Sequence, residues 1–143
     1  MRPDYEFVEG VTADLTFVAR GPTLPALFAA AAEALLAASV ADPASVAARE
    51  RVPVSLAEPD LDLLLLRFLS ELVFLRDARG LLLRAGAIDV ATDGEARLRG
   101  ELVGEPRDPA RHALERDVKA VTAYGLHVER GSEGYRARVT LDV

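Results

Sequence analysis

The stretch Asp60–Gly80, DLDLLLLRFLSELVFLRDARG, decides the fold class of this chain. Asp60 can cap a helix that runs to about Arg76, and Gly80 is a natural residue to follow a helix end. The helix carries one apolar stripe, formed by Leu61, Leu64, Leu65, Phe68, Leu72 and Leu75, which is widened beyond the usual arc by Leu63, Leu66, Leu69 and Val73. We expect such a helix either to be buried on two sides, between sheet and helix, or to hold a partner.

Strand patterns flank this helix in the sequence. Downstream, Leu81–Ala91 reads as a long strand with a bulge at Gly86, and Asp93-Gly94 is a hairpin signal before a return strand. Upstream, Val52–Leu56 alternates as a strand, and Pro53 points to a sheet edge because proline lacks a backbone donor. The centre of the chain is therefore a helix between strands.

The N-terminal third predicts a second helix between further strands. Tyr5–Val8 and Leu15–Ala19 read as strands, and Thr23 can cap a helix that stops at Asp42-Pro43, because proline restricts the residue before it. Further along, Gly104–His112 contains two prolines and reads as a loop.

The C-terminal third reads as two strands joined by a turn. Val118–Val128 is strand-like, Gly131–Gly134 is a turn, and Tyr135–Leu141 alternates apolar with polar residues. We therefore predict an α+β fold with mostly antiparallel sheets packed against two main helices, in a single domain over residues 1–143.

Composition limits the classes of function. A net charge of −6 argues against a basic surface that binds along the phosphate backbone of a nucleic acid. We therefore expect no direct nucleic-acid binding. The absence of cysteine excludes disulfides, zinc–thiolate sites and thiol nucleophiles. Met1–Glu6 is charged where a signal peptide is apolar, and no stretch approaches the roughly 18 apolar residues of a membrane span. We expect a cytoplasmic protein.

Familiar enzyme motifs do not occur in the sequence. It contains no G-x-S-x-G, P-loop, G-x-G-x-x-G or H-E-x-x-H pattern, and its only histidines are His112 and His127. His112 is most simply a residue that orders its loop by hydrogen bonds. A small metal-dependent phosphoesterase would need a general base that no residue convincingly supplies. We therefore expect a protein that is not an enzyme.

Two oxygen donors stand together at the end of the sequence. The side chain of Asp142 and, where the chain ends at Val143, the terminal carboxylate are hard ligands one residue apart. One more carboxylate would allow an oxygen-ligated divalent cation, calcium or magnesium rather than zinc, because no soft ligand is available. The alternative is a solvated acidic end.

Five blocks of sequence resemble the archease family, in family order and over nearly the whole chain. They are Tyr5-Glu6-Phe7 with Thr12-Ala13-Asp14, the stretch Gly21–Leu35, the helix Asp62–Leu75, the loop Gly104–His112, and Val118-Lys119-Ala120-Val121-Thr122 with the closing Arg138–Val143. The resemblance implies an archease-like fold and a small metal-binding accessory protein. Archeases assist the RtcB-type RNA ligase of tRNA splicing and RNA repair, by speeding its guanylylation and allowing multiple turnover.

The resemblance also implies the residues of the site. By the family's pattern the metal, calcium in the first instance and otherwise magnesium or manganese, is held by Asp14, Asp142 and Val143. Lys119, Thr12 and His112 are the residues expected to serve activation of the partner, Lys119 near the metal and Thr12 by shaping the backbone that aims Asp14.

The sequence departs from the family's pattern in two places. Val11 replaces a histidine, and Ala123-Tyr124 replaces a Tyr-His pair, so polar groups beside the expected metal site are lost. An alternative function is a chaperone or scaffolding module for RNA-processing enzymes, which would act through the apolar face of the helix Leu61–Leu75. That alternative predicts Leu63, Leu66 and Val73 to be exposed.

Overall fold

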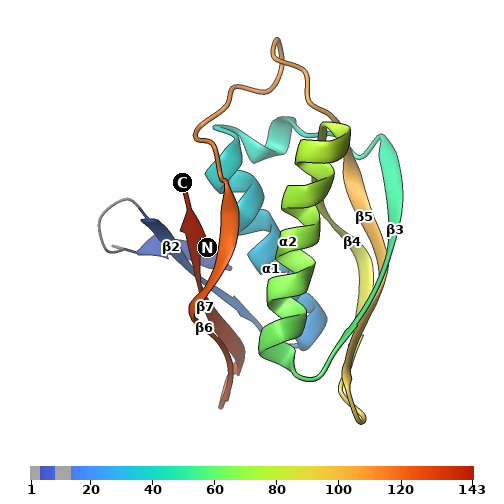
Figure 1. Ribbon diagram of the computed structural model, residues 1–143, viewed down its shortest axis with the longest axis vertical. Coiled ribbons are helices and arrows are strands. Elements are labelled where there is room, and N and C mark those ends of the chain that lie inside the picture. Colours follow the sequence, from blue (N-terminus) through green and yellow to red (C-terminus); the bar gives the residue numbers. More distant parts are fainter. Residues whose placement is uncertain (1–3, 9–13) are drawn as a thin grey trace.

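The structure is a computed structural model that describes residues 4–8 and 14–143. In it, two helices lie between two sheets (Figure 1). The elements in chain order are β1 (Tyr5–Val8), β2 (Asp14–Gly21), α1 (Leu24–Ser39), the short 3₁₀ helix η1 (Pro43–Ser45), β3 (Glu50–Glu58), α2 (Leu61–Arg79), β4 (Leu81–Ala91), β5 (Ala96–Pro106), β6 (Ala120–Gly131) and β7 (Gly134–Asp142).

Both sheets are antiparallel throughout their described pairings. The first has the strand order β1-β2-β7-β6 and the second β3-β5-β4. Helix α1 packs on β2 of the first sheet and β4 of the second, and α2 packs against β6, β4 and β3. The α+β prediction, with two main helices and antiparallel sheets, is confirmed.

Helix α1 is buried because small residues let it approach both sheets. Its buried positions include Leu27, Phe28, Ala30, Ala31, Ala32, Ala34, Leu35, Leu36 and Ala38. The predicted cap is confirmed, since Thr23 Oγ1 accepts from the Ala26 N–H at 3.3 Å. The helix ends at Ser39, before the predicted stop at Asp42-Pro43. Asp42 instead caps η1, where its side chain accepts from the Ala44 N–H at 3.2 Å.

Helix α2 begins as predicted and ends later than predicted. Asp60 Oδ1 accepts from the Leu63 N–H at 2.9 Å. The helix continues to Arg79 instead of about Arg76, and Gly80 then ends it in the left-handed region at φ 67°. No helix in the described ranges is long and apolar enough to cross a membrane.

The wide apolar face of α2 is mostly covered. Val73 is buried and Leu66 is partly buried against the core, whereas Leu63 is 43% exposed. Phe74, which the apolar stripe did not include, is 59% exposed. Two of the three residues that a broad docking face would need are therefore at least partly covered by the protein itself.

The strands of the second sheet confirm two predictions and correct a third. The strand containing Pro53 lies at a sheet edge, and β4 has a register shift between Ala85 and Ile88, around Gly86. The predicted loop Gly104–His112 was wrong at its start, because β5 continues to Pro106.

Glycine explains why the strand β5 continues. Gly104 pairs with Leu83 on one side and Glu50 on the other, and a Cβ at this position would lie 1.8 Å from the main-chain oxygen of Leu82. Only a residue without a side chain allows the two strands to approach this closely. The last connection also differs slightly from expectation, since β6 begins at Ala120 rather than Val118.

Candidate functional site

Two predicted metal ligands meet at one end of the first sheet. Asp14 is the first residue of β2, Asp142 is the last residue of β7, and they are Cα partners in the antiparallel register. Both side chains are exposed. Residues directly opposite in such a pair point to the same face, with Cβ atoms about 4.5–5.5 Å apart. The structure therefore brings two carboxylates together from opposite ends of the chain. Their strands, β2 and β7, are neighbours in the first sheet (Figure 1).

Lys119 lies beside this pair of aspartates. Its main-chain N–H donates to the carbonyl oxygen of Asp142 at 2.8 Å, and its side chain is exposed. The guanidinium of Arg76, near the end of α2, donates to the carbonyl oxygen of Val118, which is itself buried. The end of α2 thus holds the segment that carries Lys119 against the end of β7.

The structure describes only some of the other residues predicted at or near the metal site. Val143 follows Asp142, and its side chain packs partly buried against the core. Thr12 and Val11 lie outside the described residues, so the structure gives no account of them. Tyr124, the other position that departs from the family's pattern, is exposed on β6.

The chemistry of the donor set at this end suits a hard cation. Asp14 and Asp142 supply two carboxylates, and the terminal carboxylate at Val143 is the third donor predicted from the sequence. Oxygen ligands of this kind suit calcium, magnesium or manganese. Among residues 4–8 and 14–143, no group of three or more His, Cys, Asp or Glu side chains could hold a metal ion. A site here would therefore need main-chain or solvent oxygens as well.

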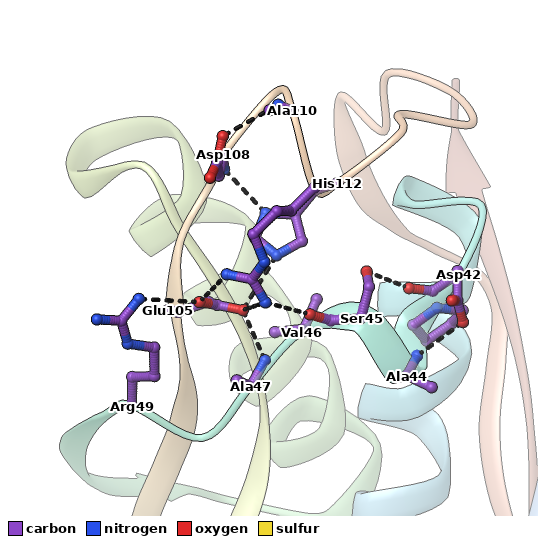
Figure 2. A network of polar contacts seen from close by, with 12 residues as sticks. Asp42, Ala44, Ser45, Val46, Ala47, Arg49, Glu105, Asp108, Ala110 and His112 are labelled. Carbon is purple, nitrogen blue, oxygen red and sulfur yellow. Dashed lines mark hydrogen bonds and ion pairs between the residues drawn. The ribbon is translucent and has the colours of Figure 1, made fainter.

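His112 lies in a different cluster, which is centred on the buried carboxylate of Glu105 (Figure 2). Glu105 is 1% exposed. Its Oε2 accepts from the Ala47 N–H at 2.7 Å and lies 3.1 Å from His112 Nε2. Arg111 donates to both carboxylate oxygens, at 2.7 and 3.0 Å. The cluster joins β5 and the loop after it to the segment that follows η1.

Hydrogen bonds keep Glu105 ionised. The bonds from Arg111, followed by the main-chain N–H of Ala47, lower the pKa of the Glu105 carboxyl from 4.5 to about 2, although burial opposes this shift. The same contact raises the pKa of Arg111. Sequence reasoning missed Glu105, because nothing local distinguishes it from the other acidic residues. Its partners come from the segment around Ala47 and from the loop beyond Pro106.

Both ring nitrogens of His112 are hydrogen bonded. Its Nδ1 accepts from the main-chain N–H of Asp108 at 2.8 Å, so the proton of the neutral ring is on Nε2 and is donated to Glu105. This arrangement supports the interpretation that His112 orders its loop. Its expected role in activating a partner stays a prediction.

His127 lies on β6 and pairs with the first turn of α2. Its Nδ1 lies 3.0 Å from Asp62 Oδ2, and Asp62 Oδ1 accepts from the Val128 N–H at 2.8 Å. The hydrogen bond and the negative charge of Asp62 raise the pKa of His127. One carboxylate therefore joins α2 to the edge strand of the first sheet.

Comparison with known proteins identifies the family. The sequence model described as "Archease protein family (MTH1598/TM1083)" matches residues 5–143. The chain belongs to the archease family. The resemblance noted in the sequence is thereby confirmed, and the matched range includes Asp14, Lys119 and Asp142.

Relatives of known name and structure agree with this assignment. Protein archease of Methanosarcina acetivorans is 33% identical over 141 residues, which are 97% of this chain and 95% of that protein. Protein archease of Pyrococcus furiosus is 32% identical over 134 residues, or 92% and 94% of the two chains. The solution structure of Methanobacterium thermoautotrophicum protein 1598 superposes with a TM-score of 0.84 at 30% identity, covering 99% of this chain and 100% of that one. The archease-like fold is confirmed.

Proposed function

We propose that this chain is a metal-binding accessory protein of an RtcB-type RNA ligase. It promotes guanylylation of the ligase and multiple turnover, in the cytoplasm, during tRNA splicing or RNA repair. Family membership supports the proposal, and the single structural observation that carries it is the direct opposition of Asp14 and Asp142 across β2 and β7.

The proposed metal site consists of Asp14, Asp142 and the terminal carboxylate of Val143, with calcium as the first candidate and magnesium or manganese as the others. Two like charges directly opposite each other destabilise a sheet, and a divalent cation between them would remove that repulsion. When bound, the cation would supply positive charge and open coordination positions to a partner's phosphate or carboxylate oxygens.

Lys119 is the residue of this site that we propose contacts the partner protein. It is exposed, and its main-chain N–H donates to Asp142, so its flexible side chain starts within reach of the proposed site. A second positive charge here would favour an anionic group on the partner, such as the phosphates of a nucleotide bound to the ligase. The net charge of −6 makes the ligase, rather than RNA, the expected direct partner.

The direct test is the rate at which the ligase of the same organism accumulates its guanylylated form with GTP. The unaltered protein should accelerate this step, whereas Asp14→Asn and Asp142→Asn should not. Asp93→Asn, which removes an exposed carboxylate in the β4–β5 turn, is the matched control and should accelerate normally.

Two results would count against the proposal in different ways. No acceleration by the folded, unaltered protein, with a competent ligase, would reject the accessory function. Normal acceleration by both aspartate variants would reject the role of the cation and leave the accessory function standing.

A second candidate function, a scaffold for RNA-processing enzymes, is favoured by the exposure of Leu63 and Phe74 on α2. Under this alternative, Leu63→Ser and Phe74→Ser would reduce stimulation of the partner, and Asp14→Asn would not. The same guanylylation assay separates the two candidates.

A further inference from the structure

A long loop, residues 107–119, connects β5 to β6. It crosses the end of the molecule at which α1 and α2 both end (Figure 1). Loops of more than about 12 residues without secondary structure are uncommon in compact domains, and those that are held in place are usually functional. This loop ends at Lys119, whose main-chain N–H donates to Asp142. It therefore leads directly to the residue that is proposed to contact the partner.

The middle of the loop forms a short ladder with the residues that follow α1. Leu114 and Val40 are antiparallel partners, and two main-chain hydrogen bonds, at 2.8 and 2.9 Å, join their neighbours on either side. A pair flanked in this way is the non-hydrogen-bonded kind, in which the residue's own N–H and C=O point away from the partner. Neither group of Leu114 is hydrogen bonded within the described residues. Leu114 therefore offers one free donor and one free acceptor at an open edge.

A hollow of about 390 Å³ lies beside this residue. Leu82 and Leu114 give the hollow an apolar surface, and Leu114 is 50% exposed. The side chains of Arg76, Arg107 and Arg116 line the rest of it together with two acids. Ligand pockets commonly have volumes of about 300–1,000 Å³. The hollow is therefore large enough to accept an apolar side chain from a partner.

The arginines of the hollow exceed its acids by one. Glu115 lies 3.9 Å from Arg116, and Asp117 lies 3.8 Å from Arg76. Arg107 is exposed and forms no ion pair in the described part of the chain. Its guanidinium is suited to bind a carboxylate through two parallel hydrogen bonds. In a chain with a net charge of −6, this corner of the surface therefore favours an acidic partner.

We propose that the open edge at Leu114 and the hollow beside it dock an extended, acidic segment of the ligase. The main chain of that segment pairs with Leu114 as an added strand, an apolar side chain enters the hollow, and a carboxylate pairs with Arg107. A small anion would use the arginine alone and would leave the open edge and the apolar surface without a partner. The inference rests on the ligase being the partner, as proposed above, and the docked segment lies on the loop that carries Lys119.

Three substitutions test the parts of this surface separately. Arg107→Glu reverses the charge that holds the carboxylate, and Leu114→Ala removes the apolar side chain. Leu114→Pro removes the free N–H as well, without breaking a hydrogen bond of the protein. Calorimetric titration with the ligase of the same organism should give a Kd about tenfold higher for Arg107→Glu and Leu114→Ala, and higher still for Leu114→Pro. Leu114→Met keeps the apolar volume and should bind within about threefold.

The guanylylation assay separates docking from the proposed cation site. Arg107→Glu should need about a tenfold higher concentration for half-maximal stimulation and should reach the full rate at saturation. Asp14→Asn should lower the rate at saturation instead. Added NaCl should weaken binding of the unaltered protein more than binding of Arg107→Glu, because salt screens the attraction between exposed charges.

Arg99→Glu is the matched control. Arg99 of β5 is also exposed and forms no ion pair within the described ranges, but it does not line the hollow. Its variant should bind the ligase like the unaltered protein. An equal loss in Arg99→Glu and Arg107→Glu would assign the effect to the total charge of the protein and would overturn the inference.

The remaining outcomes distinguish this inference from the proposed function. A loss in Arg107→Glu with full binding by Leu114→Ala would indicate a simple anion site, and equal affinities of Leu114→Ala and Leu114→Pro would reject the added strand. Unchanged binding by all three variants would overturn the docking site and leave the accessory function in place. Binding through this surface without faster guanylylation would reject the accessory function and leave the docking site. No binding of the ligase would reject both.

Discussion

Asp14 and Asp142 lie directly opposite each other at the ends of β2 and β7, and both carboxylates are exposed. Opposed like charges weaken a pair of strands, so this arrangement lowers the stability of the sheet end when no cation is present. The chain carries this unfavourable pair beside the exposed Lys119, whose main chain is hydrogen bonded to Asp142. The cation site proposed above would account for this pair.

The aspartate pair predicts opposite effects of one substitution with and without calcium. In EDTA, Asp14→Asn should raise the Tm slightly, because it removes the repulsion from Asp142. In calcium, the unaltered protein should gain about 2.7 kcal/mol when the free calcium is 100 times its Kd, and the variant should gain almost nothing. Calorimetric scans in the two buffers measure both effects. An equal calcium shift in the two proteins would contradict the prediction.

Glu105 predicts a stability difference that depends on pH. Its pKa is about 2 in the folded protein and near 4.5 otherwise, so its ionised form stabilises the fold fully above pH 4.5. That stabilisation is lost as the pH falls from 4.5 towards 2. Glu105→Gln should therefore lower the Tm clearly at pH 7, and the difference from the unaltered protein should shrink below pH 4.5.

Glu101→Gln is the control for this experiment. Glu101 is another acid of β5, but it is partly exposed and pairs at the surface with Arg51 at 2.9 Å. Surface ion pairs contribute little, so this variant should behave like the unaltered protein at every pH. A difference between Glu105→Gln and the unaltered protein that stays constant from pH 7 to pH 2 would show that the ionised carboxylate is not the cause.

His127 should titrate at a higher pH than an ordinary histidine. Asp62 favours the charged ring, so its pKa is raised above 6.5. The contribution of this pair to stability is fully present below pH 6.5 and is lost as the pH rises through the raised pKa. NMR titration of the ring signals should give a midpoint above 6.5, and Asp62→Asn should return it towards 6.5. An unchanged midpoint in that variant would assign the shift to another group, such as Glu129.

Two phenylalanines test the placement of the core. Phe28 of α1 is fully buried, with its ring 5.8 Å from that of Phe68 in α2, whereas Phe74 is 59% exposed. Phe28→Ala should cost about 3–5 kcal/mol of unfolding free energy because it leaves a cavity. Phe74→Ala should change it by less than about 0.5 kcal/mol. Urea unfolding of the two variants provides the measurement, and similar losses would contradict this placement of the helices.

Local features were the most predictable part of the fold. The caps Thr23 and Asp60 and the helix-ending residue Gly80 could be identified because each depends on residues within one turn, although α2 extends to Arg79 and not only to about Arg76. The prediction was wrong at Gly104–Pro106, which was expected to be a loop. Prolines and a glycine suggested an irregular segment, but the pairing of Gly104 between two other strands continues β5.

The sequence by itself determined the α+β class, the helix caps, the sheet-edge position of Pro53 and the chemical type of the donors at the chain end. These depend on residue type and on spacing over a few positions. Only the tertiary structure decided that Asp14 lies opposite Asp142, that Thr16 meets Thr140, and that Glu105 is buried with Arg111 and His112. The physical reason is that register between distant strands is set by how both sheets pack on the buried helix α1, and no local pattern encodes that packing.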